Sequence, residues 1–111
     1  MSTPFEELAN LDKLIHEPAR LSILTALSVC ERADFLSLRR LTGLSDGNLS
    51  VQLSKLEEAG LVEIQKQFVG KKPSTNVKIT RKGASAIQRH WQQLDTIRQS
   101  AAAWENDESK P

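Results

Sequence analysis

Residues 41–61 read LTGLSDGNLSVQLSKLEEAGL, and they carry the clearest structural signal in the chain. Leu49, Leu53 and Leu56 recur at the spacing of one helix face, which predicts a helix with a buried apolar side. Ser45 is its expected N-cap, because a serine hydroxyl can accept from the free backbone N–H groups of a first helical turn. The stretch therefore predicts a well-capped helix that begins just after Ser45.

Another helix is predicted before the one that begins after Ser45, over residues 35–42. Asp34 is its expected N-cap and Gly43 its expected stop. Only residues 43–45 separate it from the helix that follows. Two helices joined by so short a turn containing glycine are typical of a helix-turn-helix.

After the helix that begins just after Ser45, the apolar residues change from a helical spacing to a period of two. Gly60 is expected to end the helix, with Leu61 folding back on Leu56. Apolar residues then alternate with polar ones at Val62, Ile64 and Phe68, and again at Val77 and Ile79. This pattern predicts a β-hairpin over about residues 62–80 with a turn-rich tip at 69–74.

Helical patterns flank the central unit on both sides. Phe5, Leu8, Leu11, Leu14 and Ile15 predict one short amphipathic helix, and Pro18 opens another that ends near Cys30. Thr80 is the expected cap of a long last helix from Arg81 to about Trp104. The predicted class is mainly α with a small β-hairpin (α+β).

Length and composition limit the classes that remain. The 111 residues suit a single domain, placed at 1–104, with a polar, disordered tail at 105–111. No apolar run is long enough to span a membrane, the N-terminus lacks a signal-peptide pattern, and the single Cys30 precludes an internal disulfide. A cytoplasmic location is expected.

The charge is unevenly distributed along the chain. Residues 20–90 hold 12 Lys and Arg against 6 Asp and Glu, whereas both ends carry more acids than bases. A basic middle hints at a polyanionic partner, although many such charges only solvate a surface.

The exposed face of the helix after Ser45 has side chains suited to duplex DNA. Gly47, Asn48, Val51, Gln52 and Lys55 fall opposite its leucines. Amides pair with adenine edges, a valine can meet a thymine methyl, and a lysine reaches a phosphate or guanine. A glycine at the helix start would allow close approach of the backbone, with Ser45 and Gly47 at a phosphate; alternatively the glycine only relaxes a tight turn.

Two further pairs of cations are candidate phosphate contacts. Lys71 and Lys72 lie at the predicted hairpin tip, where lysines also serve to keep a sheet edge soluble. Arg81 and Lys82 occupy a first helical turn, where the helix dipole disfavours cations. A bound phosphate would explain that choice.

The ends of the chain predict a dimer interface. The last helix has a row of apolar residues that is longer than one small domain is expected to cover. The first helix has a matching apolar stripe, so both are predicted to lie in the interface. Alternatively, the apolar row of the last helix packs within its own chain. The predicted interface comprises Phe5, Leu8, Leu11, Ile87, Trp91, Leu94, Ile97, Ala101 and Trp104. The two tryptophans could instead line a pocket for an aromatic effector.

The run from about Leu14 to Lys82 resembles small MarR/ArsR-like stand-alone winged-helix transcriptional regulators. The match lies in HEPARLSIL (16–24), LTGLSDGNLSVQLSKLEEAGLVEI (41–64) and VKITRKG (77–83). It implies a winged helix-turn-helix with extra N- and C-terminal dimerisation helices, the latter at about 81–104, and a homodimer. It also implies control of transcription through DNA binding by the helix after Ser45 and by the hairpin at about 62–80, which would be the wing. The cysteine pair of ArsR-like metal sensors is missing.

The residues together predict a sequence-specific double-stranded DNA-binding regulator, a repressor acting on a palindromic operator. No catalytic set, cofactor motif or metal-ligand spacing is present in the sequence, so no enzyme, cofactor or metal is expected. Two alternatives remain: a winged-helix protein-interaction module, and a sensor whose unidentified small-molecule effector binds at the dimer seam.

Overall fold

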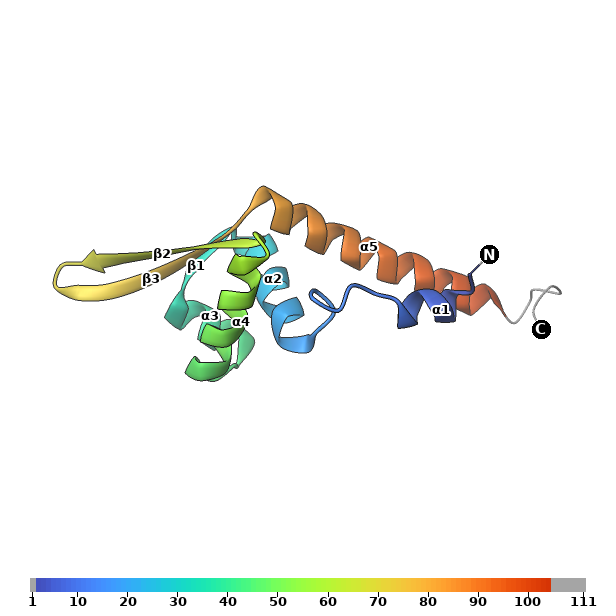
Figure 1. The fold of residues 1–111 in the computed structure, drawn as a ribbon, viewed down its shortest axis with the longest axis horizontal. Helices are drawn as coiled ribbons and strands as arrows, with labels where there is room; N and C mark the ends of the chain where they lie inside the picture. Colours follow the sequence, from blue (N-terminus) through green and yellow to red (C-terminus); the bar gives the residue numbers. More distant parts are fainter. Residues whose placement is uncertain (1, 105–111) are drawn as a thin grey trace.

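The molecule is elongated, about 67 × 25 × 21 Å, with a hairpin projecting from one end and a long helix from the other (Figure 1). The computed structural model describes residues 2–104, so the predicted tail at 105–111 lies outside the described residues. Its elements are α1 (Pro4–Ala9), α2 (Pro18–Cys30), β1 (Arg32–Asp34), α3 (Phe35–Thr42), α4 (Asp46–Glu58), β2 (Val62–Val69), β3 (Lys72–Ile79) and α5 (Arg81–Ala103). Within this part of the chain, no helix is long and apolar enough to cross a membrane.

The predicted hairpin is confirmed, but it belongs to a three-stranded antiparallel sheet of order β1-β3-β2. β1 pairs with residues 76–78 of β3. The sequence did not predict it because three residues are too few to show an alternating pattern. The predicted tip is also corrected: the turn is only Gly70-Lys71, with Gly70 at φ +67°, and Lys72 and Pro73 already belong to β3.

The hydrophobic core lies where α2, α3 and α4 meet the base of the sheet and the beginning of α5. Burying each of its leucine or isoleucine side chains stabilises the fold by about 1.5–3 kcal/mol. Its largest fully buried members are Ile23, Leu24, Leu27, Leu38, Leu49, Leu56, Val77 and Ile87.

The first predicted helix is shorter than expected. α1 ends at Ala9, with Asn10 as its C-cap. Asp12 then begins a turn, because its Oδ1 accepts from the backbone N–H of Leu14 at 2.9 Å. Leu11 and Ile15 are buried from an irregular segment, so their helical spacing was misleading.

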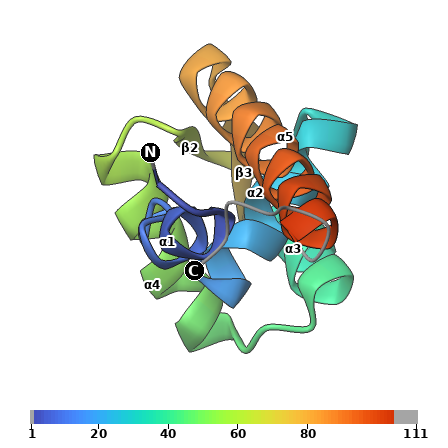
Figure 2. The same ribbon diagram turned by 90° about the vertical axis from the view of Figure 1, so that its right-hand side faces the viewer.

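Part of the predicted dimer seam is covered within the single chain. Leu11, Ile87 and Ile97 are 6%, 1% and 2% exposed, so these three predicted interface residues are already buried within one chain. α1 lies beside the far end of α5 (Figure 1, Figure 2). The ring of Phe5 meets that of Trp104 there edge-on, with the ring centroids 5.8 Å apart. The seam residues that remain most exposed are Phe5, Leu8 and Trp91.

A histidine pair joins the segment before α2 to the middle of α5. Nδ1 of His16 lies 3.0 Å from Nε2 of His90, and His90 is 3% exposed. Burial, reinforced by the neighbouring His16, lowers the pKa of His90 below its ordinary value, while Asp12 acts in the opposite direction. The folded state therefore favours the neutral form of His90.

We expect the free energy of unfolding to fall as pH decreases from about 7 to 5. An unfolded histidine has a pKa near 6.5, so the unfolded chain takes up a proton that His90 in the folded state resists. The contribution is complete above the unfolded pKa and is lost as pH falls. The carboxyl groups of Glu17 and Asp34 also have lowered pKa values, and the stability that they contribute is lost only at a lower pH than this window.

Urea unfolding at several pH values tests this expectation. His90→Gln removes the titrating group and should flatten the profile between pH 5 and 7. An equally steep decline in the variant would contradict the assignment.

Candidate nucleic-acid interface

The helix-turn-helix forms as the sequence predicted, because each boundary is fixed by a local hydrogen bond or turn. Asp34 Oδ1 accepts from the backbone N–H of Ser37 at 2.7 Å and starts α3. Gly43 ends it at φ +71°. Ser45 Oγ accepts from the N–H of Asn48 at 3.1 Å and starts α4. These caps fix where α4 begins and which of its faces points outward.

The end of α4 is a Schellman motif, also as predicted. Gly60 adopts φ +77°, its N–H donates to the carbonyl of Glu57 at 2.9 Å, and Leu61 N–H donates to that of Leu56 at 2.9 Å. Lys82 adds a further cap, since its Nζ donates to the carbonyl oxygen of Ala59 at 2.9 Å.

This bond gives the cation at Lys82 an explanation within the chain. A positive charge is favoured at the C-terminal end of a helix, and here that helix is α4. A bound phosphate is therefore not needed to explain the cation at Lys82. Arg81 and Lys82 also lie at the opposite end of α4 from Ser45 and Gly47, about 20 Å away along its 13 residues.

The outward face of α4 is polar and open. Leu49, Leu53 and Leu56 point into the core, which leaves the predicted contact residues Gly47, Asn48, Val51 and Lys55 exposed. Ser50 and Ser54 are exposed on this helix as well, although the sequence reasoning passed over them. An α-helix presented in this way has the diameter to enter a DNA major groove.

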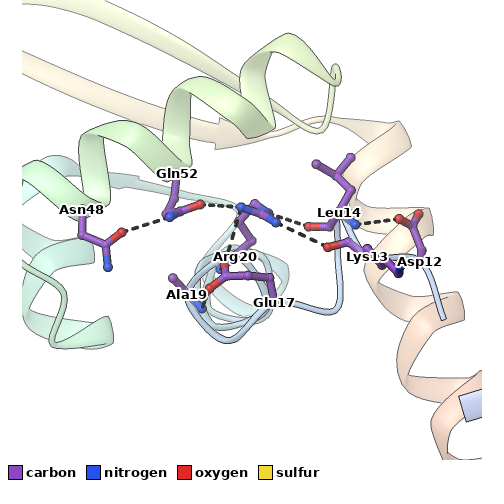
Figure 3. Close-up of polar contacts among 8 residues, drawn as sticks. All are labelled: Asp12, Lys13, Leu14, Glu17, Ala19, Arg20, Asn48 and Gln52. Atoms are coloured by element: carbon purple, nitrogen blue, oxygen red, sulfur yellow. Dashed lines mark hydrogen bonds and ion pairs between the residues drawn. The ribbon is translucent and has the colours of Figure 1, made fainter. Parts of the chain in front are cut away.

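Gln52 is less free than its place in the sequence suggested (Figure 3). Its Oε1 accepts from Nη1 of Arg20 at 2.6 Å, and its Nε2 donates to Oδ1 of Asn48 at 3.0 Å. Both ends of the amide are therefore engaged within the chain. Asn48 retains its own amide nitrogen, which Gln52 helps to orient.

Arg20 anchors this chain of bonds from α2. Its side chain is only 11% exposed, and it lies beside the carboxylate of Glu17, with Nη1 and Oε2 3.7 Å apart. Its Nε donates to the carbonyl oxygen of Leu14 at 2.6 Å (Figure 3). Arg20 is therefore a largely buried structural group rather than a surface charge.

Asp46 has a structural partner as well. Its Oδ1 accepts from Nη1 of Arg39 on α3 at 3.0 Å. The acidic residue at the start of α4 thus joins the two helices of the unit and is partly neutralised. Its carboxylate is consequently less repulsive to a polyanion than the sequence alone suggests.

A groove of about 650 Å³ runs between α4 and the base of the wing, meaning the β2–β3 hairpin. Ser50, Ser54 and Glu57 line the α4 side, and Lys66 and Thr75, which are register partners, line the other. The carboxylate of Glu57 accepts from the backbone N–H of Ile64 at 3.0 Å, so one of its oxygens is engaged within the chain. Hydroxyl groups and an ammonium group are the donors that commonly contact DNA phosphates. The sequence reasoning missed Lys66, although the period of two places it on the same face as Ile64.

The wing carries its other cations well beyond this groove. Lys71 lies in the turn, and Lys72 is paired with Val69 at the end of the hairpin. Strands of eight residues place this tip about 25 Å from the base of the sheet. The candidates thus divide into three places: the outward face of α4, the wing with its groove, and the beginning of α5.

Gly47 is a direct test of close approach at the start of α4. A Cβ there would meet no atom within 4 Å. Gly47→Ala should therefore stabilise α4 by about 0.5–1 kcal/mol through helix propensity. If the bare backbone contacts DNA, the same change should weaken DNA binding about 5- to 10-fold, measured by fluorescence anisotropy. Unchanged binding would leave the glycine with a role in the turn only.

A second hollow, of about 450 Å³, lies between the segment before α2 and α5. Its charged and titratable lining groups are Asp12, Lys82, Arg89 and His90. Among residues 2–104, no three His, Cys, Asp or Glu side chains are grouped as a metal site.

Comparison with known proteins adds to this geometry. Residues 19–97 match the family model described as a winged helix DNA-binding domain. An uncharacterized protein of Methanocaldococcus jannaschii is 37% identical over 78 residues, which is 70% of this chain and 85% of that protein.

Solved structures share the fold. A transcriptional regulator homologue from Pyrococcus horikoshii OT3 is 27% identical with a TM-score of 0.77, covering 86% of this chain and 94% of its own. A mutant MarR of E. coli complexed with operator DNA has a TM-score of 0.60 at 21% identity, with 95% of each chain covered. At that identity the likeness concerns the fold.

Proposed function

This chain belongs to the family of winged helix DNA-binding domains and is a DNA-binding transcriptional regulator; we propose that it acts in the cytoplasm as a homodimeric, sequence-specific repressor. The observation that carries the proposal is the capped, outward-facing α4, whose polar face is open beside a groove lined by hydroxyl groups, Lys66 and the hydrogen-bonded carboxylate of Glu57. Occupying a promoter is enough to exclude polymerase, and the proposed mechanism requires no cofactor.

In the proposed complex, α4 enters the major groove with its N-terminal turn leading. Gly47, Asn48, Val51 and Lys55 face the base edges, and Gln52 contributes chiefly by orienting Asn48. Ser45 and the first N–H groups of α4 meet a phosphate. The groove holds a neighbouring phosphate, and Lys71 and Lys72 extend the contact along the flanking DNA. Arg81, at the other end of α4, has the weakest support.

The homodimer is proposed from the exposed apolar side chains of α1 and α5. Phe5 and Leu8 of α1, and Trp91 in the middle of α5, remain 50%, 44% and 45% exposed. Joining two copies there would present two α4 helices to one duplex. An operator with two-fold symmetry would then match the symmetry of the protein.

Binding-site selection from random duplexes, with a mass measurement of the complex, tests this proposal. If the dimer neutralises about 6–8 phosphates, log affinity should fall with log salt at a slope of about −5 to −7. Lys66→Glu should weaken binding of the selected duplex about 10- to 100-fold, the range expected for losing a charge-assisted contact.

Lys78→Glu is the matched control, because Lys78 lies on the opposite face of the same hairpin, paired with Glu63. It should change affinity less than about 3-fold. A flat salt dependence, or unchanged DNA affinity after Lys71→Glu with Lys72→Glu, would favour a protein-interaction module. A monomer on a non-palindromic site would contradict the proposed dimer.

Control by an effector is a second candidate, favoured by the hollow beside His90. Lys82 and Arg89 at its edge suit an anionic ligand, and Ile15 and Leu61 supply apolar walls. Calorimetry with benzoate as the probe tests this candidate, with Arg89→Ala measured beside the wild type. If the wild type does not bind benzoate, the candidate is wrong.

A further inference from the structure

The wing ends in an aromatic side chain that the fold does not use. Phe68 is 74% exposed, more than any other phenylalanine or tryptophan among residues 2–104. Phe5, by comparison, packs against Trp104. A single exposed apolar side chain on a surface is ordinary, so the significance of Phe68 depends on its neighbours.

The strand register shows which way this ring faces. Alternation along β2 places Ile64, Lys66 and Phe68 on one side, and the first two line the groove that faces α4. Phe68 therefore continues the same side of the wing beyond the groove. Its register partner is the exposed Pro73, so an apolar pair lies at the end of the wing on the face that lines the groove.

The surroundings of this pair suit a polyanion. No Asp or Glu occurs between residues 64 and 94, and Lys66, Lys71 and Lys72 flank the pair. Phe68 lies two residues beyond Lys66, about 7 Å along the strand. If Lys66 contacts a DNA phosphate, the ring of Phe68 would lie beyond that sugar–phosphate backbone, at the adjoining minor groove. The minor groove is about 6 Å wide.

We propose that Phe68, supported by Pro73, inserts into the minor groove beside the α4 site, partly unstacks one base step and bends the duplex. Apolar side chains inserted at base steps are a known means of bending DNA, and lysines on either side hold the two backbones against the wedge. This inference rests on the proposed function, because it requires α4 and the groove to position the wing on DNA.

The experiment uses the full chain and the duplex selected by the wild-type protein. 2-Aminopurine is placed at each flanking step in turn to report unstacking, and dyes at the two ends report bending by energy transfer. The wild type should increase the fluorescence at one flanking step on each side and bring the ends closer. Phe68→Ala should lose both signals and bind about 10-fold more weakly, the range of one stacked aromatic side chain.

Two variants serve as controls. Phe68→Leu keeps an apolar wedge and should retain most of the bend. Val69→Ala removes a side chain that is 65% exposed on the opposite face of the strand, and it should bind within about 2-fold of the wild type. Because Phe68 and Val69 are both exposed, thermal melts of all three variants should match the wild type.

The outcomes separate this inference from the function on which it rests. If the wild type selects no duplex, the proposed function fails. If it binds a selected duplex but Phe68→Ala keeps the affinity, bend and fluorescence, the wedge is wrong. Weaker binding without any 2-aminopurine signal in the wild type also overturns it, as does a loss of self-association in Phe68→Ala, which would assign Phe68 to a contact between copies.

Discussion

Replacing Gly83 with alanine should lower the free energy of unfolding by about 3 kcal/mol or more, because the added methyl group overlaps a fixed backbone. A Cβ at this position would collide with the carbonyl oxygen of Leu61, and it would lie 2.9 Å from the carbonyl carbon and 3.0 Å from Cγ1 of Ile79. The carbonyl cannot turn away without loss, since it accepts from the N–H of Thr80 at 3.0 Å.

Urea unfolding followed by tryptophan fluorescence measures this effect. Gly47→Ala provides the matched control, because it is the same change in a helix but meets no neighbour within 4 Å. Gly83→Ala should therefore destabilise while Gly47→Ala stabilises. Equal stabilities for the two variants would show that the contact between α5 and Leu61 is looser than the structure indicates.

Arg20→Met should cost about 3 kcal/mol of stability and also impair DNA binding. Methionine fills a similar volume but removes the donors to the carbonyl oxygen of Leu14 and to Oε1 of Gln52. Each acceptor left without a partner in a largely buried place costs about 1–3 kcal/mol. Freed from Arg20, Gln52 can no longer hold Asn48 in one orientation, so affinity should fall under conditions where the variant is fully folded.

Arg39→Met is the control for this prediction. It also removes an arginine bonded to α4, but the pair with Asp46 is largely exposed and should contribute less than about 1 kcal/mol. Arg20→Lys keeps the charge with a single donor group and should be intermediate. Denaturation gives the stabilities, and anisotropy with the selected duplex gives the affinities. Similar losses for Arg20→Met and Arg39→Met would contradict the buried role of Arg20.

The features that the sequence predicted are those whose signals are local. Asp34, Ser45 and Thr80 cap helices as expected, because capping depends on a side chain and an N–H three residues away. Gly43 and Gly60 end helices because each adopts the left-handed conformation that glycine tolerates best. The helix-turn-helix and the hairpin follow from such signals.

The features that the sequence reasoning missed depend on residues that are distant along the chain. Arg20 reaches Gln52 across 32 positions, and no local pattern indicates that pairing. β1 exists only because β3 is beside it. The groove could not be predicted either, since Ser54 and Lys66 form its two sides only after the wing folds beside α4.

The joint between α4 and α5 has a mechanical consequence. Thr80 donates to the carbonyl oxygen of Gly60, Lys82 to that of Ala59, and Gly83 packs on Leu61, so the end of one helix is fastened to the start of the other. α5, with 23 residues, is about 34 Å long, and a tilt of about 10° moves its far end by about 6 Å. The chain thus contains a lever whose fulcrum is Leu61. In a dimer joined at the far ends of α5, the crossing angle of the two α5 helices would set the distance between the two α4 helices. That distance would determine which spacing of half-sites the protein can bind.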